Sequence, residues 1–275
     1  MIIDWKKIAL EKYNEVKNHI YENKLNINLK VILVWNNPDS IRYIRQKEKW
    51  ASFCNIWFEL IHLEEETTQG KLVEIIEKLN NDSETTWYLV QSPLPRHIDI
   101  DEVIEKISPL KDVDGFHQEN YWKLAIWKNS MKACTPFWIM ELLDAYDIDP
   151  EWKNVTIIWR SNIVWKPLAL MMINRGATVT VCNSKTKNLN YFTKTCDILI
   201  SATWRPQMIK KDMIWEDSIV IDVWFTVLDG KIYGDCDFES ITKNWNMITP
   251  VPWWVWPMTV AMIMKNLIRA YEIQN

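Results

Sequence analysis

The sequence contains very little glycine. Only 5 of its 275 residues are glycine, although glycine makes up about 7% of ordinary proteins. Tryptophan, normally a rare residue, is present 18 times, and the two counts together come close to an ordinary glycine count. Turns and phosphate-binding loops need glycine, because it adopts positive φ at no steric cost and lets a ligand approach the backbone. The two counts suggest that tryptophan stands where the backbone requires glycine.

Paired cysteines are also absent. The cysteines are odd in number and form no Cys-x-x-Cys pair; they are Cys54, Cys134, Cys182, Cys196 and Cys236. This pattern indicates free, reduced, buried thiols in a cytosolic protein, and it argues against a disulfide framework or a metal site.

Other metal ligands are no better placed. His62, His97 and His117 lack the spacing of metal ligands, and we expect them to be structural or solvated. Asp235 and Asp237 in the segment GDCDF suggest a cation site, but two carboxylates without further ligands are more often part of a loop or a helix cap. The sequence therefore predicts no metal.

Long apolar runs and a strong net charge are missing as well. No window reaches the roughly 18 uncharged apolar residues that a membrane span needs, and the first segment, MIIDWKKIALEKY, carries charges throughout, unlike a signal peptide. The net charge of −4 offers no general field for nucleic acid or acidic lipid. We expect a soluble, cytoplasmic protein without nucleic-acid or membrane partners, whose anionic ligands meet local basic pockets.

The sequence does contain a regular alternation of strand and helix patterns. Strands are predicted at 29–34, 56–63, 87–91, 155–159, 177–183, 197–203 and 218–225. Helices are predicted after Asp4 and at 40–53, 71–79, 134–146, 166–176 and from Pro257 to the end.

This order predicts an α/β fold of two domains with mostly parallel sheets. The first domain would comprise residues 1–133 joined by the C-terminal helix 257–275, and the second, residues 134–256, would be a Rossmann-type doubly wound sheet. In such sheets, ligands bind at the carboxyl ends of the strands.

Many tryptophans stand where the chain changes direction. They include Trp35 before NNPD, Trp159 and Trp165 in WRSNIVW, Trp204 in ATWRP, Trp224 after IDV, and Trp253, Trp254 and Trp256 in VPWWVWP. A tryptophan-rich core or an aromatic membrane belt is the alternative, but belts flank membrane spans, which the sequence lacks. We hypothesise that the backbone needs glycine at these positions, and we expect a chain with indoles there to misfold or to be inactive.

Nine motifs follow one another in an informative order. They are SIRYIRQK, VQSPLP, KDVDGFH, CTPFW, WRSNIVWKP, VCNSKT, ATWRP, IDVWF and TPVPWWVWPMT. With glycine at the tryptophan positions, the chain resembles the bifunctional methylenetetrahydrofolate dehydrogenase/methenyltetrahydrofolate cyclohydrolase family along nearly its whole length. Ser92 departs from the family's VQLPLP, and the last motif resembles the family's TPVPGGVGPMT loop.

The resemblance implies a folate site in the first domain. Tyr43 and Lys47 are four residues apart on a predicted helix and share one face with Ser40. By resemblance, Tyr43 would stack on the pterin, Lys47 would be the central catalytic group, Gln91 would orient Lys47, and Asp114 would accept hydrogen bonds from the pterin. Taken alone, Lys47 is typical of a solvated lysine and Asp114 of a turn residue. Proton transfer and activation of water are both open roles for Lys47, and either requires a pKa below the usual value of about 10.4.

Further folate contacts implied by the resemblance are Pro257 and Thr259. In the second domain the resemblance implies a cofactor site made by Trp159, Arg160, Ser161, Ser184, Thr203 and Phe225. Ser184, with Lys185 nearby and no acidic residue after the preceding strand, suggests NADP rather than NAD, although a polar loop is the simpler interpretation of that segment.

The implied activity has two steps. The enzyme would oxidise 5,10-methylenetetrahydrofolate to 5,10-methenyltetrahydrofolate with NADP, and would then hydrolyse the product to 10-formyltetrahydrofolate. The resemblance also implies a homodimer. Two alternatives remain open from the residues: a dehydrogenase without cyclohydrolase activity, and a non-catalytic dinucleotide-binding protein.

Overall fold

The computed structural model describes residues 3–158, 164–243, 247–251 and 255–274, without the side chains of 255–257. The chain forms two compact units. One comprises Ala9–Cys134 and Thr259–Asn275, and we call it the three-stranded unit; the other comprises Met1–Ile8 and Thr135–Met258, and we call it the five-stranded unit. Within the described residues, no helix combines the length and apolar character needed to cross a bilayer.

The three-stranded unit is built on a short parallel sheet. Its central strand, β1 (Asn28–Val34), pairs with β2 (Trp57–Leu63) on one side and with β3 (Trp87–Val90) on the other. The helices of this unit are α1 (Trp5–Glu22, from Ala9 onward), α2 (Pro38–Phe53), α3 (Gln69–Asn81), α4 (Ile100–Lys106), α5 (Gln118–Ala125) and α10 (Val255–Gln274, from Thr259 onward).

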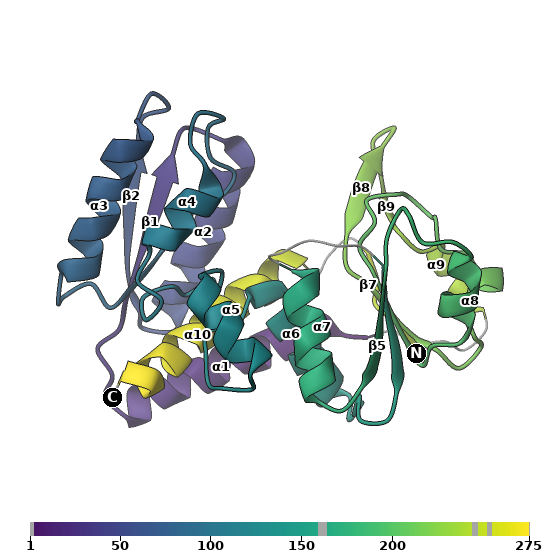
Figure 1. Cartoon of the computed structure of the whole chain (residues 1–275). Coiled ribbons are helices and arrows are strands. Elements are labelled where there is room, and N and C mark those ends of the chain that lie inside the picture. The colour runs from purple at the N-terminus through teal and green to yellow at the C-terminus, as the bar shows by residue number, and fades with distance from the viewer. Residues whose placement is uncertain (1–2, 159–163, 244–246, 252–254, 275) are drawn as a thin grey trace. The chain divides into compact units, whose positions relative to one another are not determined.

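The sheet is covered on both faces. Figure 1 shows α2 and α3 on opposite sides of β1 and β2. Ile32 and Val34 are two residues apart on β1, so their side chains lie on the same face of the sheet. Both belong to one buried cluster with Leu72 and Ile76 of α3 and Val103 of α4. Because the strand is buried on both faces, its sequence NLKVILV ends in a continuous apolar run rather than an alternating one.

Helix α2 begins at a well-defined cap. The Asn37 side chain accepts hydrogen bonds from the backbone N–H groups of Asp39 and Ser40, and Pro38 occupies the first turn. The helix therefore starts two residues before the predicted position at 40. Its buried face carries Ser40, Ile44, Lys47 and Ala51.

The five-stranded unit is the predicted doubly wound sheet. Its strands are β4 (Asn154–Ile158), β5 (Thr178–Cys182), β6 (Ile198–Ser201), β7 (Ile219–Asp222) and β10 (Met247–Ile248), all parallel, in the order β10-β7-β6-β4-β5. Its helices are α6 (Cys134–Ala145), α7 (Trp165–Asn174), α8 (Leu189–Lys194), the 3₁₀ turn η1 (Lys211–Met213) and α9 (Phe238–Thr242). Counted in chain order, the strands are arranged 2-1-3-4-5, so the topological switch point lies between β4 and β6.

Predicted boundaries were also wrong in the second half of the chain. The predicted strand 218–225 divides, because β7 ends at Asp222 and Phe225 begins β8 (Phe225–Leu228), which forms an antiparallel hairpin with β9 (Lys231–Gly234). Asp222 turns its carboxylate to accept hydrogen bonds from the backbone N–H groups of Asp235 and Cys236, and the parallel ladder stops there. The last helix begins at Val255 rather than at Pro257.

The backbone adopts positive φ at several residues that are not glycine. There are ten such residues among those described, and four of them are tryptophans: Trp35, Trp127, Trp152 and Trp204. A bulky side chain in this conformation is a genuine outlier.

Candidate active site

Lys47 lies at the centre of a buried polar cluster. Only 2% of its surface is exposed, and its Nζ donates a hydrogen bond of 2.9 Å to Oε1 of Gln91. The same Nζ lies 4.6 Å from the centre of the Tyr43 ring. A lysine this deeply buried is rare unless its amine has partners. Its burial therefore indicates a functional role rather than a packing role.

Gln91 is fixed from two directions. It follows β3 directly, and its backbone N–H donates to Ile32 O at 2.8 Å, which extends the pairing of β3 with β1. Its Nε2 donates to Ser92 O at 2.6 Å, which leaves Oε1 aimed at the lysine. The Ser92 carbonyl also lies 3.4 Å from the Ser40 hydroxyl. Both contacts use the Ser92 backbone, so the departure of Ser92 from the family motif does not disturb them.

Burial lowers the pKa of Lys47, while the nearby Asp114 and Cys134 act in the opposite direction. The amine therefore releases its proton more readily than an exposed lysine does. A neutral amine in this position can accept a proton from a bound molecule.

Tyr43 links two elements that are far apart in the sequence. Its hydroxyl lies 2.6 Å from Oγ1 of Thr259, which belongs to α10. Burial raises the pKa of Tyr43 further above neutrality, against the hydrogen bond with Thr259, so the ring stays an uncharged phenol. Ser40, Tyr43 and Lys47 all come from α2, as their spacing predicted.

Asp114 lies on a rigid loop beside this cluster. The buried carboxylate of Asp112 accepts hydrogen bonds from Gly115 N (3.1 Å), His117 N (2.8 Å) and Asn120 Nδ2 (3.2 Å). Burial raises the pKa of Asp114 to about 6, and the charge of Lys47 opposes the shift. Asp114 thus belongs to the same electrostatic neighbourhood as Lys47.

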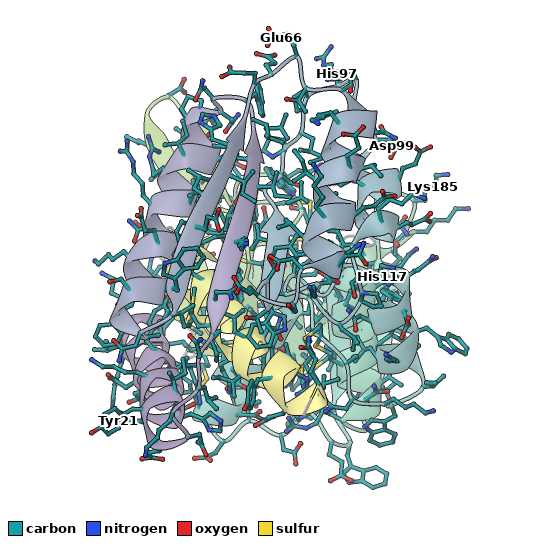
Figure 2. All side chains as sticks on the ribbon, turned by 90° about the vertical axis from the view of Figure 1, so that its left-hand side faces the viewer. Tyr21, Glu66, His97, Asp99, His117 and Lys185 are labelled. Atoms are coloured by element: carbon teal, nitrogen blue, oxygen red, sulfur yellow. The ribbon has the colours of Figure 1, made fainter. Side chains whose placement is uncertain are left out.

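Two of the three histidines considered above, His97 and His117, have structural partners. His117, labelled in Figure 2, is the N-cap of α5, and its Nδ1 accepts a hydrogen bond from Glu119 N. His97 Nε2 lies 2.9 Å from Thr67 O. Among the described residues, no three His, Cys, Asp or Glu side chains gather closely enough to hold a metal ion. The five cysteines are free and buried, as the sequence predicted.

The structure describes three of the six residues predicted to bind the cofactor, and these three lie in different places of the five-stranded unit. Trp159, Arg160 and Ser161 lie outside the described residues. Thr203 follows β6 at the switch point and is buried. Ser184 is exposed in the turn after β5, and Phe225 is half-buried at the start of β8, its ring 6.2 Å from that of Trp224.

The loop that contains Thr203 is held by Asp235. The Asp235 carboxylate accepts hydrogen bonds from the backbone N–H of Thr203, from the Ser201 hydroxyl at 3.1 Å and from Arg205 N at 3.2 Å. Asp237, the second acid of the segment, caps α9 by accepting from Ser240 N. The two carboxylates therefore serve a loop and a helix cap, the more ordinary of the roles that the sequence allowed.

The sequence interpretation did not single out three buried polar residues. Asp112 fixes the loop of Asp114, Asp222 lies beneath the hairpin of the other unit, and Asn266 of α10 contacts the chain next to Asp114. The role of Asp222 could have been suspected from the sequence, because its carboxylate stands at the end of the apolar strand pattern IVID. A lone asparagine within an apolar helix gives no comparable signal.

Two family models match the chain. The model described as the catalytic domain of tetrahydrofolate dehydrogenase/cyclohydrolase matches residues 3–114, and the model described as the NAD(P)-binding domain of the same family matches residues 133–275. The chain belongs to the tetrahydrofolate dehydrogenase/cyclohydrolase family. The resemblance drawn from the nine motifs is thereby confirmed.

Members of this family match over nearly the whole chain. A protein called bifunctional protein FolD from Halothermothrix orenii is 46% identical over 274 residues, which cover 98% of this chain and 97% of that one. The crystal structure of the bifunctional enzyme FolD from Campylobacter jejuni is 40% identical, covers 100% of this chain and 99% of that one, and has a TM-score of 0.95. The structure from Trypanosoma brucei, complexed with NADP and an inhibitor, is 30% identical with a TM-score of 0.87 and covers 100% of this chain and 98% of that one.

The buried Asp222 predicts a pH dependence of stability. Burial and the neighbouring Asp235 raise the pKa of Asp222 to about 8, far above that of an unfolded aspartate, about 3.9. Between these two values the folded chain keeps a proton that the unfolded chain releases, so stability falls as pH rises from about 4 to about 8. We expect the urea midpoint to decrease across this range, and Asp222→Asn to reduce the slope.

Asp217→Asn, at an exposed position, is the matched control and should leave the slope unchanged. A slope that is the same in Asp222→Asn as in the unaltered protein would contradict the assignment.

Proposed function

We propose that this chain oxidises 5,10-methylenetetrahydrofolate to 5,10-methenyltetrahydrofolate with NADP and hydrolyses the product to 10-formyltetrahydrofolate. The observation that carries the proposal is the buried pair of Lys47 and Gln91 beside the Tyr43 ring, in a chain of the dehydrogenase/cyclohydrolase family. A non-catalytic binding protein has no need of a buried lysine with a lowered pKa. A dehydrogenase alone has no need of a proton acceptor at this place.

The folate is held by residues of the three-stranded unit. The flat ring of Tyr43 is a platform for the pterin, and the carboxylate of Asp114 accepts hydrogen bonds from its amino and ring N–H donors. Asp114 binds best when ionised, and Lys47 favours that form while its amine carries a proton. Ser40 and Thr259 of the same unit are further proposed substrate contacts, and Pro257, which precedes this unit's part of α10, is another. The platform is steady because Thr259 holds the Tyr43 hydroxyl.

Hydrolysis depends on Lys47 as a proton acceptor. A water molecule adds to the methenyl carbon, a C–O bond forms, and the neutral amine takes a proton from the water. The hydroxyl then loses its proton to give the formyl C=O, while the bond from that carbon to one ring nitrogen breaks and the nitrogen takes up a proton. One proton is released overall. Gln91 keeps the amine directed at the reacting carbon, which lowers the cost of orientation.

The residues of the five-stranded unit fit NADP. The segment after β5, NSKTK, contains no carboxylate, and the bond from Lys185 N to Asn183 Oδ1 (2.9 Å) shapes its turn while Ser184 and Lys185 remain exposed. A hydroxyl and a cation at this place suit a 2′-phosphate, whereas a carboxylate would suit a ribose hydroxyl. NADP, when bound, supplies the acceptor for the hydride.

Among the other proposed cofactor contacts, Thr203 follows β6 at the switch point of the sheet. Trp159, Arg160 and Ser161 come directly after β4 in the sequence. Phe225 begins β8, next to the end of β7. Oxidation needs little from the chain beyond positioning of the two reactants.

The proposal extends to domains, assembly and location. Residues 1–133 with helix 257–275 would bind the folate, and residues 134–256 would bind NADP. The separate family models for a catalytic and an NAD(P)-binding domain support this division. The enzyme would act as a homodimer, as the family resemblance implies, and in the cytoplasm, as its free thiols suggest.

Replacement of the buried lysine should separate the two reactions. We expect Lys47→Met to slow methenyltetrahydrofolate hydrolysis by at least ~100-fold, the lower range for loss of a general acid or base, while NADP binding is retained. The decay of the methenyl absorbance measures hydrolysis, and cofactor fluorescence measures binding. Lys49→Met, on the exposed face of the same helix, is the control. Full hydrolysis by the Lys47 variant would refute the assignment.

The loop after β5 should select the phosphorylated cofactor. Oxidation of methylenetetrahydrofolate, followed in parallel with NADP and NAD, should give the higher kcat/KM with NADP. Lys185→Ala should reduce that preference by about tenfold, equivalent to about 1.4 kcal/mol of phosphate binding. Equal rates with both cofactors in the unaltered enzyme would contradict the prediction.

A further inference from the structure

Asn266 of α10 joins the two backbone segments beside the proposed folate site. It is fully buried, and its Nδ2 donates hydrogen bonds of 2.8 Å to both Val113 O and Lys132 O. Val113 immediately precedes Asp114. A single side-chain amide therefore holds the loop of Asp114 and the segment that leads into α6.

The two segments also touch directly. Gly115 has φ +71°, and a Cβ built on it would lie 2.6 Å from the carbonyl carbon of Lys132. Only glycine allows this approach, since a side chain would push the two segments apart. The Asp112 carboxylate fixes the same loop from within. The loop is thus held by Asp112 on one side and by Asn266 on the other.

Asparagine has the chemistry that this place requires. Its amide nitrogen carries two hydrogens and meets two carbonyl oxygens, whereas a carboxylate would bring only acceptors and a leucine would leave both carbonyls without this donor. Asn266 Oδ1 has no hydrogen-bond partner among the described residues. An acceptor buried without a partner is costly, so the two bonds made by Nδ2 are the reason for an amide in this apolar helix.

We propose that Asn266 is a positioning residue, which sets the place of the Asp114 carboxylate relative to Lys47 and thereby the affinity for the folate. The inference rests on the proposed function, in which Asp114 binds the pterin. Asn266 itself touches no substrate.

The test compares binding of folate with binding of NADP. We expect Asn266→Leu to raise KM for methylenetetrahydrofolate by about tenfold or more, with the NADP dissociation constant unchanged. Leu267→Ala removes buried volume from the same helix and should lower the melting temperature without changing KM for the folate. Should Asn266→Leu not fold, Gly115→Ala disturbs the same junction from the loop side and should give the same selective change.

An unchanged KM in the folded Asn266 or Gly115 variant would overturn the positioning role. Absence of turnover in the unaltered enzyme would instead count against the proposed function, so the two failures are distinguishable.

A second inference comes from the tryptophans with positive φ. Their φ values are 73° for Trp35, 61° for Trp127, 64° for Trp152 and 61° for Trp204. Aspartate and asparagine tolerate this conformation because their short side chains bond locally, and they account for another four of the ten residues concerned. Tryptophan has no short polar side chain that bonds locally, and the one indole bond that these four described residues make, from Trp35 Nε1 to Pro93 O at 3.0 Å, reaches a residue far along the chain.

Trp127 occupies the end of a helix where glycine is preferred. Its N–H donates to Leu124 O (3.1 Å), and Lys128 N donates to Lys123 O (2.8 Å). The same pair of bonds ends α7, where Gly176 stands in place of the tryptophan with φ +81°. This is the Schellman motif, whose residue after the cap is usually glycine.

Trp152 and Trp204 repeat the pattern in turns. Trp152 is the third residue of the turn that the bond from Lys153 N to Pro150 O closes. A positive φ at this place in a turn favours glycine. The side chain of Trp152 is 88% exposed. Trp204 follows Thr203 at the ligand edge of the sheet, 54% exposed, with its ring 4.1 Å from that of Trp224. Neither indole is buried, so little packing offsets the strain, and Trp204 directly follows Thr203, a proposed NADP contact.

We infer that the active form of this protein carries glycine at positions 35, 127, 152 and 204, and that at 204 the bare backbone admits NADP. The part concerning NADP rests on the proposed function. The part concerning the backbone does not.

Single substitutions separate these effects. Trp127→Gly and Trp152→Gly should raise the urea midpoint, since glycine relieves the strain. Trp122→Gly is the matched control, because Trp122 is also exposed but lies within α5, where glycine lowers stability. Trp204→Gly should tighten NADP binding by about tenfold or more, whereas Trp152→Gly, at the opposite edge of the sheet, should leave it unchanged.

Peptide mass mapping of the protein from its natural source gives the direct answer. Peptides lighter by the difference between tryptophan and glycine at the four positions would support the inference. Intact tryptophan there in a turning-over enzyme, or lower stability of Trp127→Gly and Trp152→Gly, would overturn it. Unchanged NADP affinity in Trp204→Gly would overturn the part concerning the cofactor.

Discussion

The hydrogen bond between Lys47 and Gln91 is the contact around which the proposed site is arranged. A lysine amine can be buried only if its proton is easily lost or its charge is compensated, and both conditions are met here. Gln91 accepts from the amine, Asp114 lies close enough to influence its pKa, and the Tyr43 ring lies against it. Each of these partners comes from a different part of the chain or from a different turn of α2, so the site exists only when the three-stranded unit is fully packed.

The positions of the long elements could be predicted because their patterns are long. The apolar run of β1 and the spacing of Tyr43 and Lys47 on α2 both agree with the structure. The short helices α4, α5, α8 and α9, of five to eight residues, have too few turns to show a period. The run SIVIDVWF stays apolar beyond Asp222, so the sequence pattern could not show where the parallel strand stops and the hairpin starts.

The members of the candidate site could be predicted, but only some of its contacts. The resemblance implied that Gln91 orients Lys47, and the structure has this bond. The bond between Tyr43 and Thr259 joins α2 to α10, which are far apart in the sequence, and was not predicted. Asn266 escaped notice because one asparagine in an apolar helix looks like a tolerated exception. The left-handed backbone at four tryptophans, in contrast, agrees with what composition alone suggested, because the two abnormal counts and these four φ angles point to the same requirement for glycine.

The three-stranded unit is discontinuous in the chain, since Thr259 and Asn266 return to it from α10 after the whole five-stranded unit has been made. During synthesis, a nascent chain that has not yet passed Thr259 has its lysine and its glutamine but neither the threonine that steadies Tyr43 nor the amide beside Asp114. The proposed folate site is therefore completed only after the whole five-stranded unit has been synthesised, because two of its supporting contacts come from α10.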